Sequence, residues 1–150
     1  MILSRLLRAQ LAATLLALPL AAQGPVACAV KDLPTHAFVA NDVSLTVNAL
    51  SGYKAFDRER KFAGRARVEF TVVNTSAAFR RFDPQDLCLV GKDGVQVFPV
   101  FERNLADDTQ PMPLRLAPGA RATREYALSG RLAFPAKVYF GEALVAEVSE

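Results

Sequence analysis

The sequence is poor in the residues that carry most enzyme chemistry. Its 150 residues include one histidine, two cysteines, two methionines and no tryptophan. A Ser-His-Asp triad or a Cys-His pair would therefore have to use His36, which lies ahead of the first expected strand. No glycine-rich phosphate-binding motif is present, because the glycines are isolated at turn positions. The composition therefore predicts a protein that is not an enzyme and holds no cofactor.

Metal-binding patterns are equally sparse. Zinc sites usually combine several Cys or His ligands at short spacings, whereas Cys28 and Cys88 are 60 positions apart. Periplasmic copper proteins commonly use clusters of Met and His, yet Met112 is the one methionine after the first residue. The sequence therefore indicates no metal ligand set. A periplasmic metal-binding or chaperone-like domain is kept as an alternative function, and a small envelope hydrolase as a second alternative.

The N-terminus has the features of a secretory leader. Arg5 and Arg8 precede an apolar run from Leu11 to Ala22, which has the length of a signal-peptide hydrophobic region and is short for a membrane span. A proline near the end of this run, followed by small residues, fits recognition by a signal peptidase. We therefore expect a helical signal peptide over residues 1–22, an exported protein that is periplasmic or secreted, and no transmembrane span in the mature chain.

The cleavage position determines whether the mature chain contains Cys28. Cleavage after Ala22 leaves residues 23–37 as an N-terminal linker and allows a disulfide between Cys28 and Cys88. Cleavage after Ala29, where an Ala-Cys-Ala triplet ends, removes Cys28. The Pro-Val-Ala-Cys stretch also loosely resembles a bacterial lipobox, so lipid attachment to Cys28 and membrane anchoring form a third alternative. The sequence leaves all three open.

Removal of the leader makes the chain nearly neutral. The whole sequence has 18 Lys and Arg against 15 Asp and Glu, and the loss of Arg5 and Arg8 leaves 16 against 15, a net charge of +1. A nearly neutral domain lacks the field that recruits polyanions, so we predict no nucleic-acid partner. We expect the partner to be a protein or a cell-envelope component of unknown identity. The candidate interaction surface consists of basic residues: Lys54, Arg58, Arg60, Lys61, Arg80 and Arg81.

Alternation of apolar and polar residues at period two recurs along the rest of the chain. The segments Val43 to Leu50 and Arg65 to Asn74 each place apolar residues on one face and mostly polar residues on the other, as in a half-buried antiparallel strand. Leu114 to Leu128 and Ala136 to Glu150 each predict two strands around a glycine turn. The polar, proline-containing segment Glu102 to Pro113 is expected to be a loop.

The strongest local prediction is a hairpin that contains the second cysteine. Two strands, Asp86 to Val90 and Val95 to Val100, flank the turn Gly-Lys-Asp-Gly. The buried face of this hairpin is expected to hold four residues: Leu87, Leu89, Val95 and Val97. Cys88 would then point to the other face and be partly exposed.

Residues 38–150 are therefore expected to form one all-β domain, a single antiparallel immunoglobulin-like β-sandwich of about seven or eight strands. Three motifs in this domain resemble the exported bacterial family DUF4352: a strand ending in Val-Val-Asn, a Phe-x-Pro-x-Asp segment that leads to an Asp-Gly turn, and Leu-x-Pro-Gly. The residues that carry the resemblance are Val72, Val73, Asn74, Phe82, Pro84, Asp86, Leu87, Leu89, Asp93, Gly94, Leu116, Pro118 and Gly119.

The resemblance covers about Asp42 to Phe140. It implies an exported immunoglobulin-like β-sandwich of unknown function with no established catalytic site. Such sandwiches place their binding surfaces in loops and along exposed strands. The favoured function is therefore a noncatalytic binding or interaction module of the bacterial cell envelope.

Overall fold

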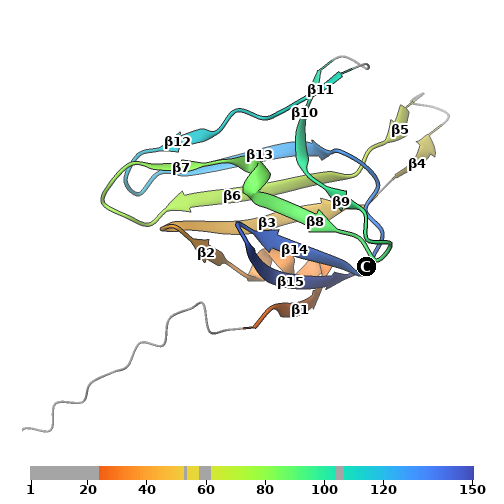
Figure 1. Cartoon of the computed structure of the whole chain (residues 1–150), viewed down its shortest axis with the longest axis horizontal. Helices are drawn as coiled ribbons and strands as arrows, with labels where there is room; N and C mark the ends of the chain where they lie inside the picture. Colours follow the sequence, from red (N-terminus) through yellow and green to blue (C-terminus); the bar gives the residue numbers. More distant parts are fainter. Residues whose placement is uncertain (1–23, 53, 58–61, 104–106) are drawn as a thin grey trace, which may run out of the picture.

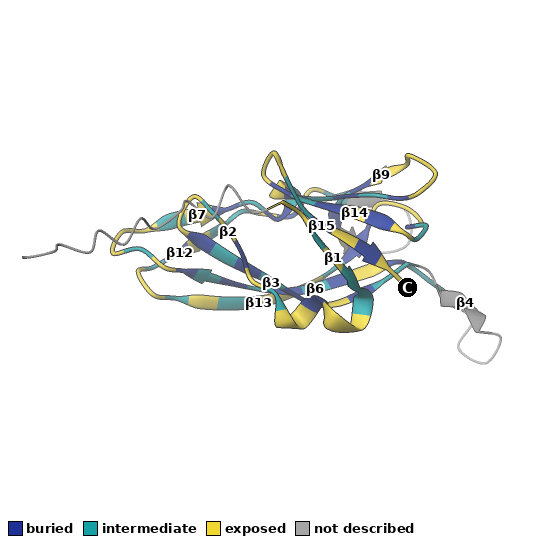
Figure 2. Cartoon of the chain, turned by 90° about the horizontal axis from the view of Figure 1, so that it is seen from below, coloured by how far each residue is buried: buried dark blue, intermediate teal, exposed yellow. Residues whose placement is uncertain are grey.

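Two β-sheets lie face to face and enclose the hydrophobic core (Figure 1), and Figure 2 shows the two layers one above the other. The structure is a computed structural model, and it describes residues 24–52, 54–57, 62–103 and 107–150. In order across the six-stranded sheet, the strands are β11 (Asp107–Thr109), β10 (Pro99–Arg103), β13 (Arg121–Leu128), β6 (Arg67–Asn74), β3 (Val43–Ser51) and β2 (Phe38–Ala40). In order across the five-stranded sheet, they are β1 (Val26–Ala29), β15 (Ala143–Ser149), β14 (Ala136–Phe140), β8 (Leu87–Val90) and β9 (Gln96–Val97).

Two further strand pairs and two short helices complete the described part of the chain. The strand pairs are β7 (Arg80–Phe82) with β12 (Leu114–Leu116), and β4 (Lys54–Asp57) with β5 (Phe62–Gly64). The 3-10 helices are η2 (Val30–Thr35) and η3 (Pro84–Asp86). Among the residues described, no helix has both the length and the apolar character needed to cross a membrane.

The alternation in β3 and β6 builds the centre of the core. Val68, Phe70 and Val72 of β6 are fully buried, and β6 pairs with β3 on one side and with β13 on the other. A bulge at Asn48 shifts the register of β3, which returns Leu50 to the buried face. Burial of one such apolar side chain contributes about 1.5–3 kcal/mol relative to exposure, so the period-two pattern decides which face of each strand turns inward.

The prediction of an all-β antiparallel sandwich is confirmed. The described strands are shorter and more numerous than the expected seven or eight, partly because the β4–β5 and β7–β12 pairs stand apart from the two main sheets. One pair departs from the antiparallel pattern, since β1 runs parallel to β15.

Two segments have more regular structure than their sequence predicts. Residues 23–37 were expected to be a linker, but Val26–Ala29 forms β1 at the edge of a sheet and Val30–Thr35 forms η2. The expected loop from Glu102 to Pro113 contains the end of β10 and the whole of β11. In both cases a short strand is stabilised by a partner strand, which local composition does not reveal.

The predicted hairpin around Cys88 is present. β8 and β9 are antiparallel, and Leu89 lies opposite Val97 with both side chains buried. Gly94 has a φ of 78°, the left-handed conformation that a tight turn requires and that glycine adopts without strain. The prediction for Val95 is wrong: its side chain is 48% exposed, because it belongs to the turn and not to β9.

Candidate functional site

A buried asparagine fixes the loops at one end of the sandwich. Asn74 has no exposed surface, and its amide nitrogen donates to the backbone oxygens of Ala78 (2.7 Å), Leu116 (3.1 Å) and Ala117 (3.1 Å). Its amide oxygen accepts from the backbone N–H (2.9 Å) and the hydroxyl (2.8 Å) of Ser76. One side chain thus connects the end of β6 to the segment before β7 and to β12, and this positions the two strands of the β7–β12 ribbon.

The two faces of the β7–β12 ribbon differ in chemistry. Phe82 and Leu116 are buried, and the Phe82 ring packs edge-on against Phe70 with 5.4 Å between centroids. Arg81 and Arg115 lie directly opposite each other in the register, and both are exposed. Because side chains alternate between faces along a strand, the two arginines share the face that points away from the core.

Arg115 and Arg80 differ in the groups that their side chains contact. The Arg115 guanidinium lies over the ring of Phe79, 4.0 Å from its centroid, and Phe79 remains 50% exposed. Arg80 forms an ion pair with Asp42 in the turn before β3, with 2.9 Å between Nη2 and Oδ2. The charge of Arg80 is therefore compensated, whereas Arg115 contacts an uncharged ring.

Within the described part of the chain, neither Arg81 nor Arg115 has an ion-pair partner. Partial desolvation first, and then the charge of Asp83, raise the pKa of Asp86 above its ordinary value. A backbone hydrogen bond with Asp83 and, to a smaller extent, the charge of Arg81 oppose this rise. Like charges directly opposite each other in an antiparallel pair are destabilising. The ribbon therefore holds two exposed arginines that form no ion pair in the described part of the chain, although Asp86 is close enough to Arg81 for their opposite charges to attract.

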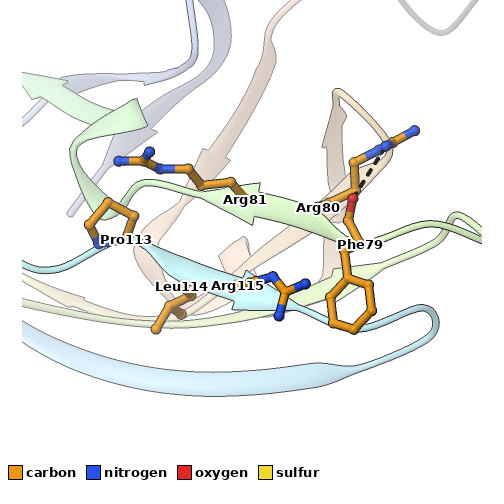
Figure 3. A pocket seen from close by; sticks show the side chains of 6 residues that line it. All are labelled: Phe79, Arg80, Arg81, Pro113, Leu114 and Arg115. Carbon is orange, nitrogen blue, oxygen red and sulfur yellow. Dashed lines mark hydrogen bonds between the residues drawn. The ribbon is translucent and has the colours of Figure 1, made fainter.

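An open groove of about 500 Å³ runs along the ribbon. Its lining combines cationic and apolar side chains: Phe79, Arg80, Arg81, Pro113, Leu114 and Arg115. Figure 3 shows the guanidinium groups of Arg81 and Arg115 directed away from each other along the ribbon. Two separated cations beside apolar surface can bind a ligand that carries more than one anionic group. We name this surface, with these six lining residues, the ribbon groove.

A second groove, of about 340 Å³, has a different charge arrangement. It lies on the five-stranded sheet, and Lys92, Lys137 and Glu147 are among its lining residues. Glu147 is directly opposite Lys137 in the β14–β15 register, which is a favourable pair of opposite charges. This second groove therefore serves as a basic surface for comparison with the ribbon groove.

Two of the six residues predicted for the interaction surface lie in the ribbon groove, namely Arg80 and Arg81. Lys54 begins β4, and its side chain is not among the described features. The other three residues lie outside the described part of the chain: Arg58, Arg60 and Lys61. The structure therefore places two of the six predicted residues, Arg80 and Arg81, in one groove.

Sequence reasoning missed Arg115. The β7–β12 pairing joins Arg81 to a residue 34 positions later, and nothing local to either strand specifies that partner. The alternation Leu114-Arg115-Leu116 does contain a signal, since it predicts an exposed arginine between two inward-facing leucines. The alternation predicts the face of the strand on which Arg115 lies, but it does not predict that Arg81 lies opposite it.

The structure does not bring the two cysteines together. Cys28 lies in β1 and Cys88 in β8, and β15 and β14 lie between them in the same sheet. Three strand spacings of about 4.8 Å separate the two backbones by about 14 Å, whereas a disulfide needs Cα atoms within about 7 Å. This strand order does not accommodate the Cys28–Cys88 disulfide that the sequence left open, and both thiols are free.

Neither thiol is placed as an activated nucleophile. Partial burial first, and then the charge of Asp32, raise the pKa of the Cys28 thiol. Partial burial also raises the pKa of the Cys88 thiol, although an interaction with Gln96 opposes the shift. Because the thiolate is the reactive form, both shifts reduce nucleophilicity at neutral pH. His36 directly follows η2, and the described residues contain no group of three His, Cys, Asp or Glu side chains that could hold a metal ion.

No family model matches this chain, and no curated protein matches it. Among solved structures, the chain is similar to the yjhA protein from Bacillus subtilis, with 19% identity, a TM-score of 0.46 and coverage of 71% of this chain and 78% of that protein. It is also similar to a DUF1425 family member from Shewanella sp. pv-4, with 16% identity, a TM-score of 0.35 and coverage of 69% of this chain and 93% of that protein. At these values neither likeness carries an argument about family or function.

Proposed function

We propose that this protein is an exported, noncatalytic interaction module whose ribbon groove binds a carboxylate-bearing segment of a partner protein. The observation that carries the proposal is the cross-strand pair of exposed arginines, Arg81 and Arg115, neither of which forms an ion pair with a described residue. Both guanidinium groups are exposed at the groove, so a bound carboxylate would supply the ion pair that the described residues do not.

The side chains of the groove favour a protein ligand. A guanidinium group presents a planar fork of N–H donors that matches a carboxylate with two parallel hydrogen bonds. The two guanidinium groups diverge along the ribbon, so an extended chain with spaced carboxylates can reach both (Figure 3). Phe79, Pro113 and Leu114 provide apolar surface for the side chains between those carboxylates. Arginine and aromatic residues are also enriched at protein–protein interfaces.

Export is supported by the sequence of residues 1–22, and a relationship to DUF4352 by the three motifs described above. Several motif residues have clear structural roles in the sandwich. Asn74 connects three backbone segments, and Gly94 and Gly119 have φ values of 78° and 71° at turns. Membership in DUF4352 belongs to the proposal, because its support is the motif residues and no family model matches the chain.

The other two functions considered from the sequence have less support. A metal-binding domain would need a ligand cluster, and the described residues contain none. A hydrolase that uses Cys88 would need a more acidic thiol than partial burial allows. The binding function is therefore preferred on positive evidence, which is the charge arrangement of the ribbon groove.

The proposal is tested by titrating the mature protein, purified after export, into a fluorescein-labelled octaglutamate peptide and following anisotropy at low ionic strength. The wild-type protein is expected to bind octaglutamate and not a labelled octaglutamine peptide. The double variant Arg81→Gln/Arg115→Gln is expected to bind octaglutamate at least about tenfold more weakly, because both charge-assisted contacts are lost.

The matched control is the double variant Lys92→Gln/Lys137→Gln, which also removes two positive charges, but from the second groove. It should change the affinity by less than about twofold. Equal weakening in both double variants, or no binding by the wild type, would refute the ribbon groove as the site. Binding to phosphatidylglycerol vesicles without binding to octaglutamate would identify a lipid surface as the ligand and overturn the protein-partner proposal.

A further inference from the structure

Strand β1 is an integral edge of the five-stranded sheet. It pairs in parallel with β15, which places Val26 beside Ala146 and Cys28 beside Val148. Ala146 and Val148 have no exposed surface, and Val26 and Cys28 pack, partly buried, against the same core. Helix η2 follows β1 without a break and buries Leu33 completely. The folded domain therefore includes β1, about a dozen residues before the start expected from the alternation pattern.

Two of the three processing routes are incompatible with this edge. Cleavage after Ala29 would remove the whole of β1, withdraw Val26 and Cys28 from the core, and expose the backbone N–H and C=O groups of β15. An unpaired strand edge is prone to pairing with other chains. Lipid attachment requires cleavage immediately before Cys28, which would remove Val26. It would also join a diacylglyceryl group to a side chain that packs against the core.

We propose that a signal peptidase cleaves after Ala22, so that the mature chain begins at Gln23, keeps β1 and carries Cys28 unmodified. This inference rests on the export that forms part of the proposed function. The peptidase hydrolyses the bond between Ala22 and Gln23 with one water molecule, leaving a carboxylate on the leader and an amino group on Gln23. Residues 23–25 then separate the cut from β1. The small-residue triplet that ends at Ala29 matches the cleavage rule, but its residues are needed in the sheet.

The test is the intact mass of the protein expressed with its own leader in a bacterial host and purified from the periplasmic and membrane fractions. The expected mass is that of residues 23–150 with two free thiols. The mass of residues 30–150, or of a chain that begins at Cys28 with added lipid, would overturn the inference. Uncleaved residues 1–150 confined to the cytoplasm would instead refute export itself, which separates failure of the proposed function from failure at the cleavage site.

Two matched variants locate the cut independently of the fold. Ala22→Val and Ala29→Val each replace a small residue by a branched one at one candidate site, and signal peptidase requires a small residue there. The chain that begins at Gln23 should disappear in Ala22→Val and persist unchanged in Ala29→Val. The opposite result, in which only Ala29→Val alters the product, would place the cut after Ala29 and contradict the inference.

Discussion

The outer face of the six-stranded sheet and the outer face of the β7–β12 ribbon each contain two like charges directly opposite each other. On the sheet, Glu69 lies opposite Glu125. Each of these carboxylates has a partner of its own: Asn48 Nδ2 is 3.3 Å from Glu69 Oε1, and Arg67 Nε is 2.6 Å from Glu125 Oε1. The sheet therefore offsets the repulsion that its register creates.

The ribbon has no ion pair of this kind. Arg81 and Arg115 form no ion pair in the described part of the chain, Asp86 attracts Arg81 from a greater distance, and Arg115 lies over the ring of Phe79. A like-charge pair is by itself a weak sign of function, because the sheet has one whose carboxylates are bound by neighbouring side chains. A like-charge pair that its surroundings leave unsatisfied is the stronger sign of a ligand site.

The largest effect is expected from removing the side chain that fixes the ribbon to the sheet. Asn74→Ala removes hydrogen bonds to three backbone oxygens and to Ser76, and it leaves buried polar groups without partners. The free energy of unfolding should fall by about 2–4 kcal/mol in urea titrations. Asn48→Ala is the control, because this half-buried asparagine makes fewer hydrogen bonds and should cost about 1 kcal/mol. Equal, small losses in both variants would show that Asn74 does not anchor the ribbon.

A second, smaller effect on stability is expected when an acidic residue is placed opposite Arg115 in the ribbon. Arg81→Glu places a carboxylate opposite Arg115, which should raise the free energy of unfolding by about 0.2–1 kcal/mol, less the attraction to Asp86 that Arg81 no longer provides. The same change should abolish octaglutamate binding, because a negative charge replaces a positive one in the groove. Lys92→Glu is the control and should leave binding nearly unchanged. Loss of stability in Arg81→Glu, measured by urea titration, would argue against repulsion in the wild-type ribbon.

Removal of the ring beneath Arg115 should have a modest effect on binding. Phe79→Ala removes a cation–π contact worth about 0.5–1 kcal/mol at an exposed site, which corresponds to a loss of affinity of roughly twofold to fivefold. Met112→Ala is the control, since Met112 is an exposed apolar side chain, 83% accessible, outside the lining of the groove. Equal affinities for the two variants in the anisotropy titration would mean that Phe79 does not orient Arg115 for binding.

The smallest effect on stability is expected from breaking the ion pair between Arg67 and Glu125 on the six-stranded sheet. Arg67→Gln removes the ion pair with Glu125, in which both side chains are about half exposed, so stability should fall by at most about 1 kcal/mol. Octaglutamate binding should be unchanged, because this arginine lies on the sheet and not in the ribbon groove. A loss of binding equal to that of Arg81→Gln would show that the two faces do not differ in function.

The parts of the fold that could be predicted are those in which local pattern and tertiary burial agree. Val43, Leu45 and Val47 alternate with polar residues, and all three are buried as the period of two requires. The turn at Gly94 was predictable because tight turns need residues that adopt positive φ without strain. Strand β1 was not predictable, because its pairing with β15 joins residues from opposite ends of the chain.

The candidate site was predictable in part for the same reason. The adjacent arginines Arg80 and Arg81 stand out in the sequence, but their different roles do not. Arg80 pairs with Asp42 from a distant turn, and Arg81 is set against Arg115 by a strand pairing. Charge compensation is a property of three-dimensional neighbours, so the unsatisfied pair becomes visible only in the folded chain.

The most direct measurement is a two-dimensional ¹H–¹⁵N NMR titration of the mature protein with unlabelled octaglutamate. If octaglutamate binds the ribbon groove, the largest changes in chemical shift should occur in the amides of residues 79–82 and 114–116. Largest changes on the outer face of β3, β6 and β13, or around Lys92 and Lys137, would contradict it. No saturable change anywhere in the spectrum would contradict it as well.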